Sequence, residues 1–84
     1  MASEDKHPKL VALEGKVSLF IKAEMKRVGL TYEEVAHRLK KHGFNENAAS
    51  MANKLSRGTF QATFLLAVLA AIGKESVTLS EICD

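Results

Sequence analysis

Four side chains at helical spacing have the chemistry to contact a nucleic acid. Ser50, Asn53, Lys54 and Arg57 recur at intervals of three and four residues, so a helix would place them on one face. This face offers hydroxyl, amide and cationic donors, has no carboxylate, and ends in two cations. Such a set suits contacts with base edges and phosphate oxygens better than simple exposure to water.

The helix that must position these donors lies within residues 45–60. Its opposite face is apolar and consists of Ala48, Met51, Ala52 and Leu55. Asn45 is expected to cap this helix, which should run to about Ser56. It should end at Gly58, because glycine readily adopts the left-handed conformation.

A shorter helix is expected before it, starting at Tyr32. Thr31 can accept a hydrogen bond from the amide of Glu34 while the Glu34 side chain reaches back, which is the capping-box arrangement. The residues expected to be buried are Val35, Ala36 and Leu39. Basic residues gather towards the helix end, where cations suit the dipole, and Gly43 stops it.

Two further helices should complete the core. The first begins at Pro8 and ends at Gly29, although Gly15 costs roughly 1 kcal/mol relative to alanine and leaves residues 9–15 open as a separate turn. Its apolar stripe is Leu10, Leu13, Val17, Phe20, Ile21, Met25 and Val28. The other spans residues 60–72, with Thr59 as its cap. This helix is apolar almost all round, so it must be surrounded by the domain or partly by a second copy.

The ends of the chain are less determined. Residues 1–7 have no periodic apolar pattern and are expected to be a disordered tail. Residues 8–76 would then form one domain, and residues 77–84 a C-terminal segment that could help to form a dimer. Within that segment, residues 76–80 alternate as in a strand, whereas Thr78 and Glu81 could cap a final helical turn.

Composition excludes several classes of protein. The 84 residues, 46% hydrophobic and 26% charged, are typical of one folded domain. Cys83 is the one cysteine, so no internal disulfide can form and a cytoplasmic location is expected. The longest apolar run, residues 64–72, is far shorter than the ~20 residues that span a bilayer, so no membrane partner is expected.

No catalytic or metal site is expected either. His37 and His42 are five residues apart, which is off the spacing that brings two ligands together on a helix. Glu33 and Glu34 are adjacent and diverge, so they fit first-turn charges rather than an acid and base pair. Because there is also no glycine-rich phosphate loop, we expect no enzyme activity, no cofactor and no small-molecule ligand.

The positive charge is concentrated in the segment with the two short helices. Residues 37–61 contain Arg38, Lys40, Lys41, Lys54 and Arg57 against Glu46, a balance of +4, whereas the rest of the chain nets to −2. A basic patch of this kind is the electrostatic footprint that phosphate binding requires. We therefore expect Lys40 and Lys41 to contact phosphates.

The two short helices form the pattern of a helix-turn-helix. Residues 30–36, LTYEEVA, resemble the leucine-threonine-glutamine-glutamate-glutamate-leucine-alanine run of the Xre or lambda-repressor-like family. Residues 53–58, NKLSRG, resemble the end of that family's recognition helix. The stretches IKAEMKRVGLTYEE and NKLSRGTF are similar to those of a family of small, uncharacterised bacterial domains, which brings no established activity.

The lambda-repressor-like resemblance implies roles for individual residues. By position, it implies base contacts for Ala49, Ser50, Asn53 and Lys54. For the DNA backbone it implies contacts by Tyr32, Arg57, Thr59 and Gln61. The chain departs from the family's pattern in the longer interval between Ala36 and Gly43, with Tyr32 in place of glutamine and Ser56 in place of glutamate.

Together these observations predict an all-α protein, a compact four- to five-helix bundle of the lambda-repressor-like kind. The resemblance implies sequence-specific binding of double-stranded DNA by a homodimeric transcriptional regulator, located at the nucleoid when bound. The alternative is a phage- or plasmid-borne adaptor that uses the apolar fourth helix and the C-terminal segment to hold a protein partner. Cations of residues 38–57 gathered on one exposed face would favour DNA, and scattered cations with a dominant hydrophobic patch would favour the adaptor.

Overall fold

A computed structural model describes residues 7–83, and within them every regular element is helical. The elements are α1 (Pro8–Val28), α2 (Tyr32–Leu39), a 3₁₀ turn η2 (Lys40–His42), α3 (Ala48–Arg57), α4 (Ala62–Ala71) and α5 (Leu79–Cys83). The expected all-α, four- to five-helix bundle is therefore confirmed. The tail expected over residues 1–7 lies, apart from His7, outside the described residues.

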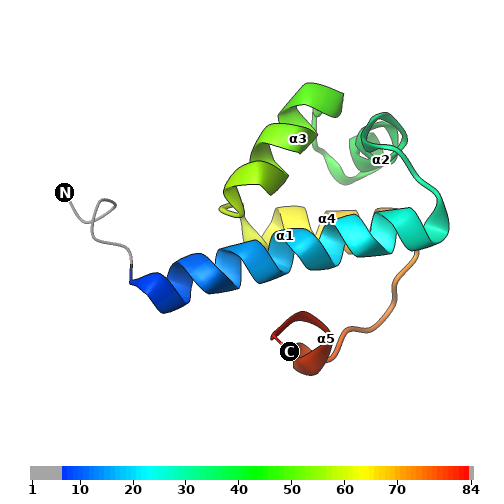
Figure 1. Cartoon of the computed structure of the whole chain (residues 1–84). Coiled ribbons are helices and arrows are strands. Elements are labelled where there is room, and N and C mark those ends of the chain that lie inside the picture. The colour runs from blue at the N-terminus through cyan, green and yellow to red at the C-terminus, as the bar shows by residue number, and fades with distance from the viewer. Residues whose placement is uncertain (1–6, 84) are drawn as a thin grey trace.

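The long helix α1 packs against α3 and α5, and α2 packs against α3 and α4 (Figure 1). His7 caps it by accepting from the Lys9 amide, Pro8 occupies its first turn, and Gly29 ends it in the left-handed conformation at φ 76°. The helix continues through Gly15, so the separate turn over residues 9–15 does not form. None of the described helices is long and apolar enough to cross a membrane.

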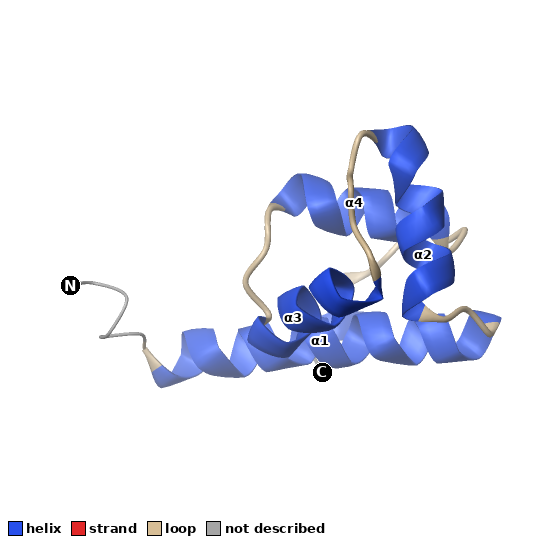
Figure 2. Ribbon diagram, turned by 90° about the horizontal axis from the view of Figure 1, so that it is seen from above, coloured by secondary structure: helices blue, strands red, loops and turns tan. Residues whose placement is uncertain are grey.

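The predicted apolar stripe of α1 is only partly buried. Leu10 and Leu13 are 46% and 44% exposed, contrary to expectation. The first turns of α1 extend past the rest of the bundle, so no other helix covers them (Figure 2). The buried core draws on α2, α3 and α4 as well as the later turns of α1. Its members are Phe20, Ile21, Met25, Val35, Ala36, Leu39, Met51, Leu55, Phe64, Ala67, Val68, Ala71 and Ile72.

The predicted capping box of α2 is confirmed. The Glu34 amide donates to Thr31 Oγ1 at 3.1 Å, and the Thr31 amide donates to Glu34 Oε1 at 2.8 Å. The extra length before α3 takes the form of η2, which adds a tighter turn to α2 and stops at Gly43 with φ 87°. A link over residues 44–47 without regular secondary structure then leads to α3.

Helix α3 begins later than expected. Asn47, not Asn45, is its cap: Asn47 Oδ1 accepts from the Ser50 amide at 2.8 Å, and Ser50 Oγ accepts from the Asn47 amide at 2.9 Å. This reciprocal pair satisfies two otherwise free donors, so it fixes the start of the helix. Met51 and Leu55 are fully buried as predicted, but Ala48 in the first turn is exposed.

Small residues let α3 cross closely over α1. The Ser18 hydroxyl donates to the Leu55 carbonyl at 2.5 Å in a buried contact. Gly58, with φ 68°, lies against α1 so tightly that an added Cβ would be 2.5 Å from the Glu14 carbonyl oxygen. Gly58 therefore both ends α3 and fixes the position at which α3 packs on α1.

Helix α4 also starts later than predicted, and Thr59 is not its cap. Gln61 occupies the cap position with extended backbone and no side-chain hydrogen bond. Phe60 remains outside the helix and packs on Phe64 with ring centroids 5.2 Å apart, while Phe44 packs edge-on against the same ring at 5.7 Å. Leu66 is 64% exposed, so the chain itself covers only one side of this apolar helix.

The C-terminal segment ends in helix α5, so the strand interpretation of residues 76–80 is wrong. The Thr78 amide donates to Glu81 Oε2 at 2.8 Å, as the predicted cap requires. Helix α5 packs on α1, where Lys16 donates to the Cys83 carbonyl at 2.6 Å.

Candidate functional site

The side of α3 that faces α4 is closed by a polar cluster around Glu46. Lys54 forms an ion pair with Glu46 Oε2, and the Ser50 hydroxyl donates to Glu46 Oε1 at 2.6 Å. The Lys54 ammonium also lies 4.8 Å from the centroid of the Phe64 ring, a cation–π contact. The Glu46 side chain is only 6% exposed, so this cluster is part of the packing between α3 and α4.

The charge state of Glu46 follows from these contacts. Burial raises the pKa of the Glu46 carboxyl, but hydrogen bonds from Lys54 and Ser50 outweigh burial and the net shift is downward. Glu46 is therefore ionised at neutral pH and neutralises Lys54. Ser50 and Lys54, both expected to contact bases, are instead bound to Glu46: Ser50 donates its hydroxyl proton to the carboxylate, and the Lys54 ammonium is paired with it.

The outer face of α3 carries Asn53 at its centre. Ala49 lies one turn before Asn53, Arg57 lies one turn after it, and all three are exposed. Within the described residues the Asn53 side chain makes no hydrogen bond and α3 carries no carboxylate. The outer face therefore presents a free amide between a methyl group and a guanidinium.

One cation of α1 borders the end of this face and a second lies near the start of α2, and the sequence interpretation included neither. Lys22 lines a hollow against the C-terminal end of α3 together with Ser56, Arg57 and Glu14. Lys22 also lines a second hollow with Lys26 and Tyr32 at the start of α2. Neither lysine forms an ion pair within residues 7–83, so their charge is open to solvent.

The basic residues of α2 and η2 lie elsewhere. Arg38 donates to the Ala71 carbonyl at 2.9 Å and so caps the C-terminal end of α4. Lys40 and Lys41 are exposed and line a shallow hollow with His37 and Arg38. The cations of residues 38–57 are thus divided: two are engaged internally, two lie on η2 and one lies at the end of α3.

The two polar residues expected to contact phosphate from the link before α4 are exposed. Thr59 and Gln61 lie between Gly58 and the first turn of α4. The Thr63 hydroxyl is 3.4 Å from Gln61 Oε1, which is a weak contact. Within residues 7–83, the Gln61 amide therefore has no strong hydrogen bond holding it in place.

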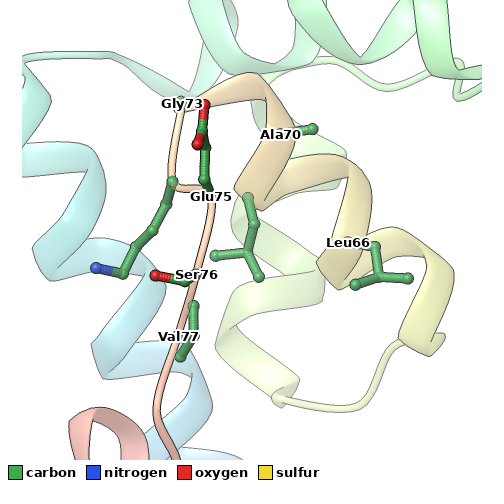
Figure 3. Close-up of a pocket in the computed structure, with 8 residues that line it drawn as sticks. Leu66, Ala70, Gly73, Glu75, Ser76 and Val77 are labelled. Atoms are coloured by element: carbon green, nitrogen blue, oxygen red, sulfur yellow. The ribbon is translucent and has the colours of Figure 1, made fainter.

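A separate apolar groove of about 510 Å³ lies between α4 and the segment that follows it. Figure 3 shows Leu66 and Ala70 on α4 at one side and Ser76 and Val77 on the segment at the other. Other exposed apolar side chains are dispersed over Leu10, Val11, Leu13 and Leu19 of α1 and Leu79 of α5. No acid and base pair lies in the groove, whose charged lining residues are Lys74 and Glu75.

Comparison with known proteins gives a family but no activity. No curated protein matches the chain, and no solved structure does. The likeness to the lambda-repressor-like family stays a prediction. One family model matches residues 13–77, which run from the first half of α1 to the segment before α5. The chain therefore belongs to the family described as "Domain of unknown function (DUF6471)".

Proposed function

We propose that this protein binds double-stranded DNA through the outer face of α3 and acts as a small transcriptional regulator, with two copies forming the binding unit. The observation that carries the proposal is the exposed row Ala49, Asn53 and Arg57, which has no carboxylate and is bordered at its C-terminal end by Lys22. A helix with this face fits the major groove, and cations beside it fit the flanking phosphates.

The cations that support the proposal differ from those expected from the sequence. Arg38 and Lys54 have internal partners, whereas Lys22, Lys26 and Arg57 lie beside α3 and the start of α2. Tyr32 adds a hydroxyl donor to this group from the first turn of α2. Phosphate binding is thus assigned to α1, the start of α2 and the end of α3, with Lys40 and Lys41 as a second, more distant pair.

The salt dependence of binding tests these roles. Fluorescence anisotropy with a random duplex pool should give an affinity that falls steeply with salt, and Lys22→Ala and Arg57→Ala should each reduce the slope by about one. Lys9→Ala is the matched control, because Lys9 lies on the first turn of α1, away from α3. The proposal fails if the parent protein does not bind at low salt, and the assigned roles fail if all slopes are equal.

A homodimer makes a geometric prediction for the DNA site. Two recognition helices related by a twofold axis enter successive major grooves, so the half-sites should be centred about 34 Å apart. Sedimentation analysis of the free and DNA-bound protein tests this stoichiometry. One copy per site with a footprint of a single half-site would contradict it.

The second candidate function is a protein-interaction module, and the exposed groove beside α4 is the observation that favours it. Leu66 projects from the uncovered side of α4, and Leu69, Ala70 and Val77 continue an apolar surface. In this function Leu66→Ser would abolish partner binding and leave DNA affinity unchanged. The DNA proposal ranks first because the exposed apolar side chains are dispersed over three helices rather than gathered in one patch.

A further inference from the structure

We infer that α3 selects A·T base pairs, with Asn53 recognising adenine and Ala49 contacting the thymine methyl group. The inference rests on the proposed DNA binding and specifies its substrate. It follows from which polar groups of α3 remain free once the internal contacts of the helix are taken into account.

The internal contacts remove two of the four expected base-reading residues. The Ser50 hydroxyl has one proton and donates it to Glu46, and the same oxygen accepts from the Asn47 amide. Lys54 is held by Glu46 on the side of α3 that faces α4. Breaking either contact would remove one of the two partners of the largely buried Glu46 carboxylate, which costs free energy.

The remaining chemistry of α3 disfavours G·C pairs. Guanine is most often read by an arginine or lysine that donates to O6 and N7, and cytosine by a carboxylate that accepts from N4. Helix α3 has no carboxylate, and its free cation, Arg57, is in the last turn, where Gly58 lies against α1. Recognition helices contact bases through their N-terminal residues, so Arg57 is placed for phosphate rather than for guanine.

The two exposed residues Ala49 and Asn53 have the chemistry needed to recognise an A·T base pair. An asparagine amide can donate to adenine N7 and accept from adenine N6, and an alanine methyl packs on the C5-methyl of thymine. Ala49 and Asn53 are four residues apart on the exposed face, a rise of about 6 Å along the helix axis. This rise is close to two base-pair steps of about 3.4 Å, so the two side chains can reach base pairs two steps apart.

Modified bases test the two contacts separately. After selection of preferred duplexes from a random pool, replacing adenine by 7-deazaadenine removes the N7 acceptor, and replacing thymine by uracil removes the methyl group. In the parent protein each replacement should weaken binding by about fivefold or more. Asn53→Ala should lose sensitivity to 7-deazaadenine and keep sensitivity to uracil.

Ser56→Ala provides the matched control, because Ser56 is exposed on the same helix and should retain both sensitivities. A selected motif rich in G·C pairs, or equal affinity of the parent for normal and modified duplexes, overturns the inference while DNA binding itself stands. Absence of binding to every duplex at low salt overturns the proposed function and this inference together.

Discussion

The two polar sides of α3 are made from similar residues but differ in what those residues can do. On the side facing α4, Ser50 and Lys54 are bound to Glu46, whose side chain is almost fully buried. On the outer face, Ala49 and Asn53 are exposed, and the Asn53 amide has no hydrogen-bond partner among residues 7–83. One side is therefore structural and the other is available for a partner.

This difference shows why charge in a sequence is a poor measure of charge on a surface. Arg38 and Lys54 account for much of the basic balance of residues 37–61, yet one caps α4 and the other neutralises a buried carboxylate. Lys22 and Lys26 lie on α1, outside residues 37–61, and neither forms an ion pair within residues 7–83; Lys22 borders the end of α3 and Lys26 lies near the start of α2. The free cations beside α3 come partly from a helix that is distant in sequence.

The largest expected effect on stability comes from disrupting the close contact between Gly58 and α1, which holds α3 in place. In Gly58→Ala, the new Cβ would be 2.5 Å from the Glu14 carbonyl oxygen at a backbone φ of 68°. We expect the free energy of unfolding to fall by about 3 kcal/mol, measured by urea denaturation. Gly15→Ala is the control, because its Cβ meets nothing within 4 Å and should raise stability by about 0.5 to 1 kcal/mol. Similar effects at both glycines would contradict the close crossing of α1 and α3.

Removing the Glu46 contacts on the side of α3 that faces α4 should lower stability by a smaller amount. Glu46→Ala removes the partner of Lys54 and Ser50, so we expect the free energy of unfolding to fall by about 2 kcal/mol. Asn53→Ala on the outer face should change it by less than about 0.5 kcal/mol and reduce DNA affinity instead. Equal losses of stability in the two variants would show that the two sides do not differ as described.

The smallest effect on stability is expected from protonation of Glu81, a carboxylate that is paired with Lys74. A backbone hydrogen bond from Thr78, followed by the Lys74 ammonium, lowers the pKa of Glu81 from 4.5 to about 2. Because the folded pKa is depressed, the stabilisation is complete above pH 4.5 and is lost as the pH falls towards 2. Lys74→Met should raise the pKa of Glu81 in an NMR titration and leave the lowered pKa of Glu46 unchanged. A pKa of Glu81 that does not respond would show that Lys74 is not its partner in solution.

The parts of the fold set by neighbouring residues could be predicted from the sequence. Gly29, Gly58 and the pair Thr31 and Glu34 determine helix ends through contacts within a few residues, and all were assigned correctly. Two helix starts were wrong because each segment offers competing caps. Asn47 has a partner in Ser50, whereas the Asn45 side chain has no hydrogen bond to any described residue. Phe60 stays outside α4, where its ring packs on Phe64.

The candidate site was less predictable because it depends on distant contacts. Helical spacing identified the outer position of Asn53 but gave no sign that Glu46, in the link before α3, would bind Lys54. The sequence signal for Lys22 and Lys26 was their position off the apolar stripe of α1. That position does not show which other helices lie beside them, which only the packing of α2 and α3 determines. Likewise, exposure of Leu10 and Leu13 follows from where the other helices end, which no local pattern records.

The most direct test of the central claim is to map the DNA-binding surface by NMR. An isotope-labelled sample titrated with a duplex should show shifts of backbone amides at Ala49, Asn53 and Arg57 and in the turns of α1 that carry Lys22 and Lys26. Amides of Leu66 and Val77, which line the groove beside α4, should remain unchanged. Shifts confined to α4 and the segment after it, or no shifts at low salt, would contradict the account.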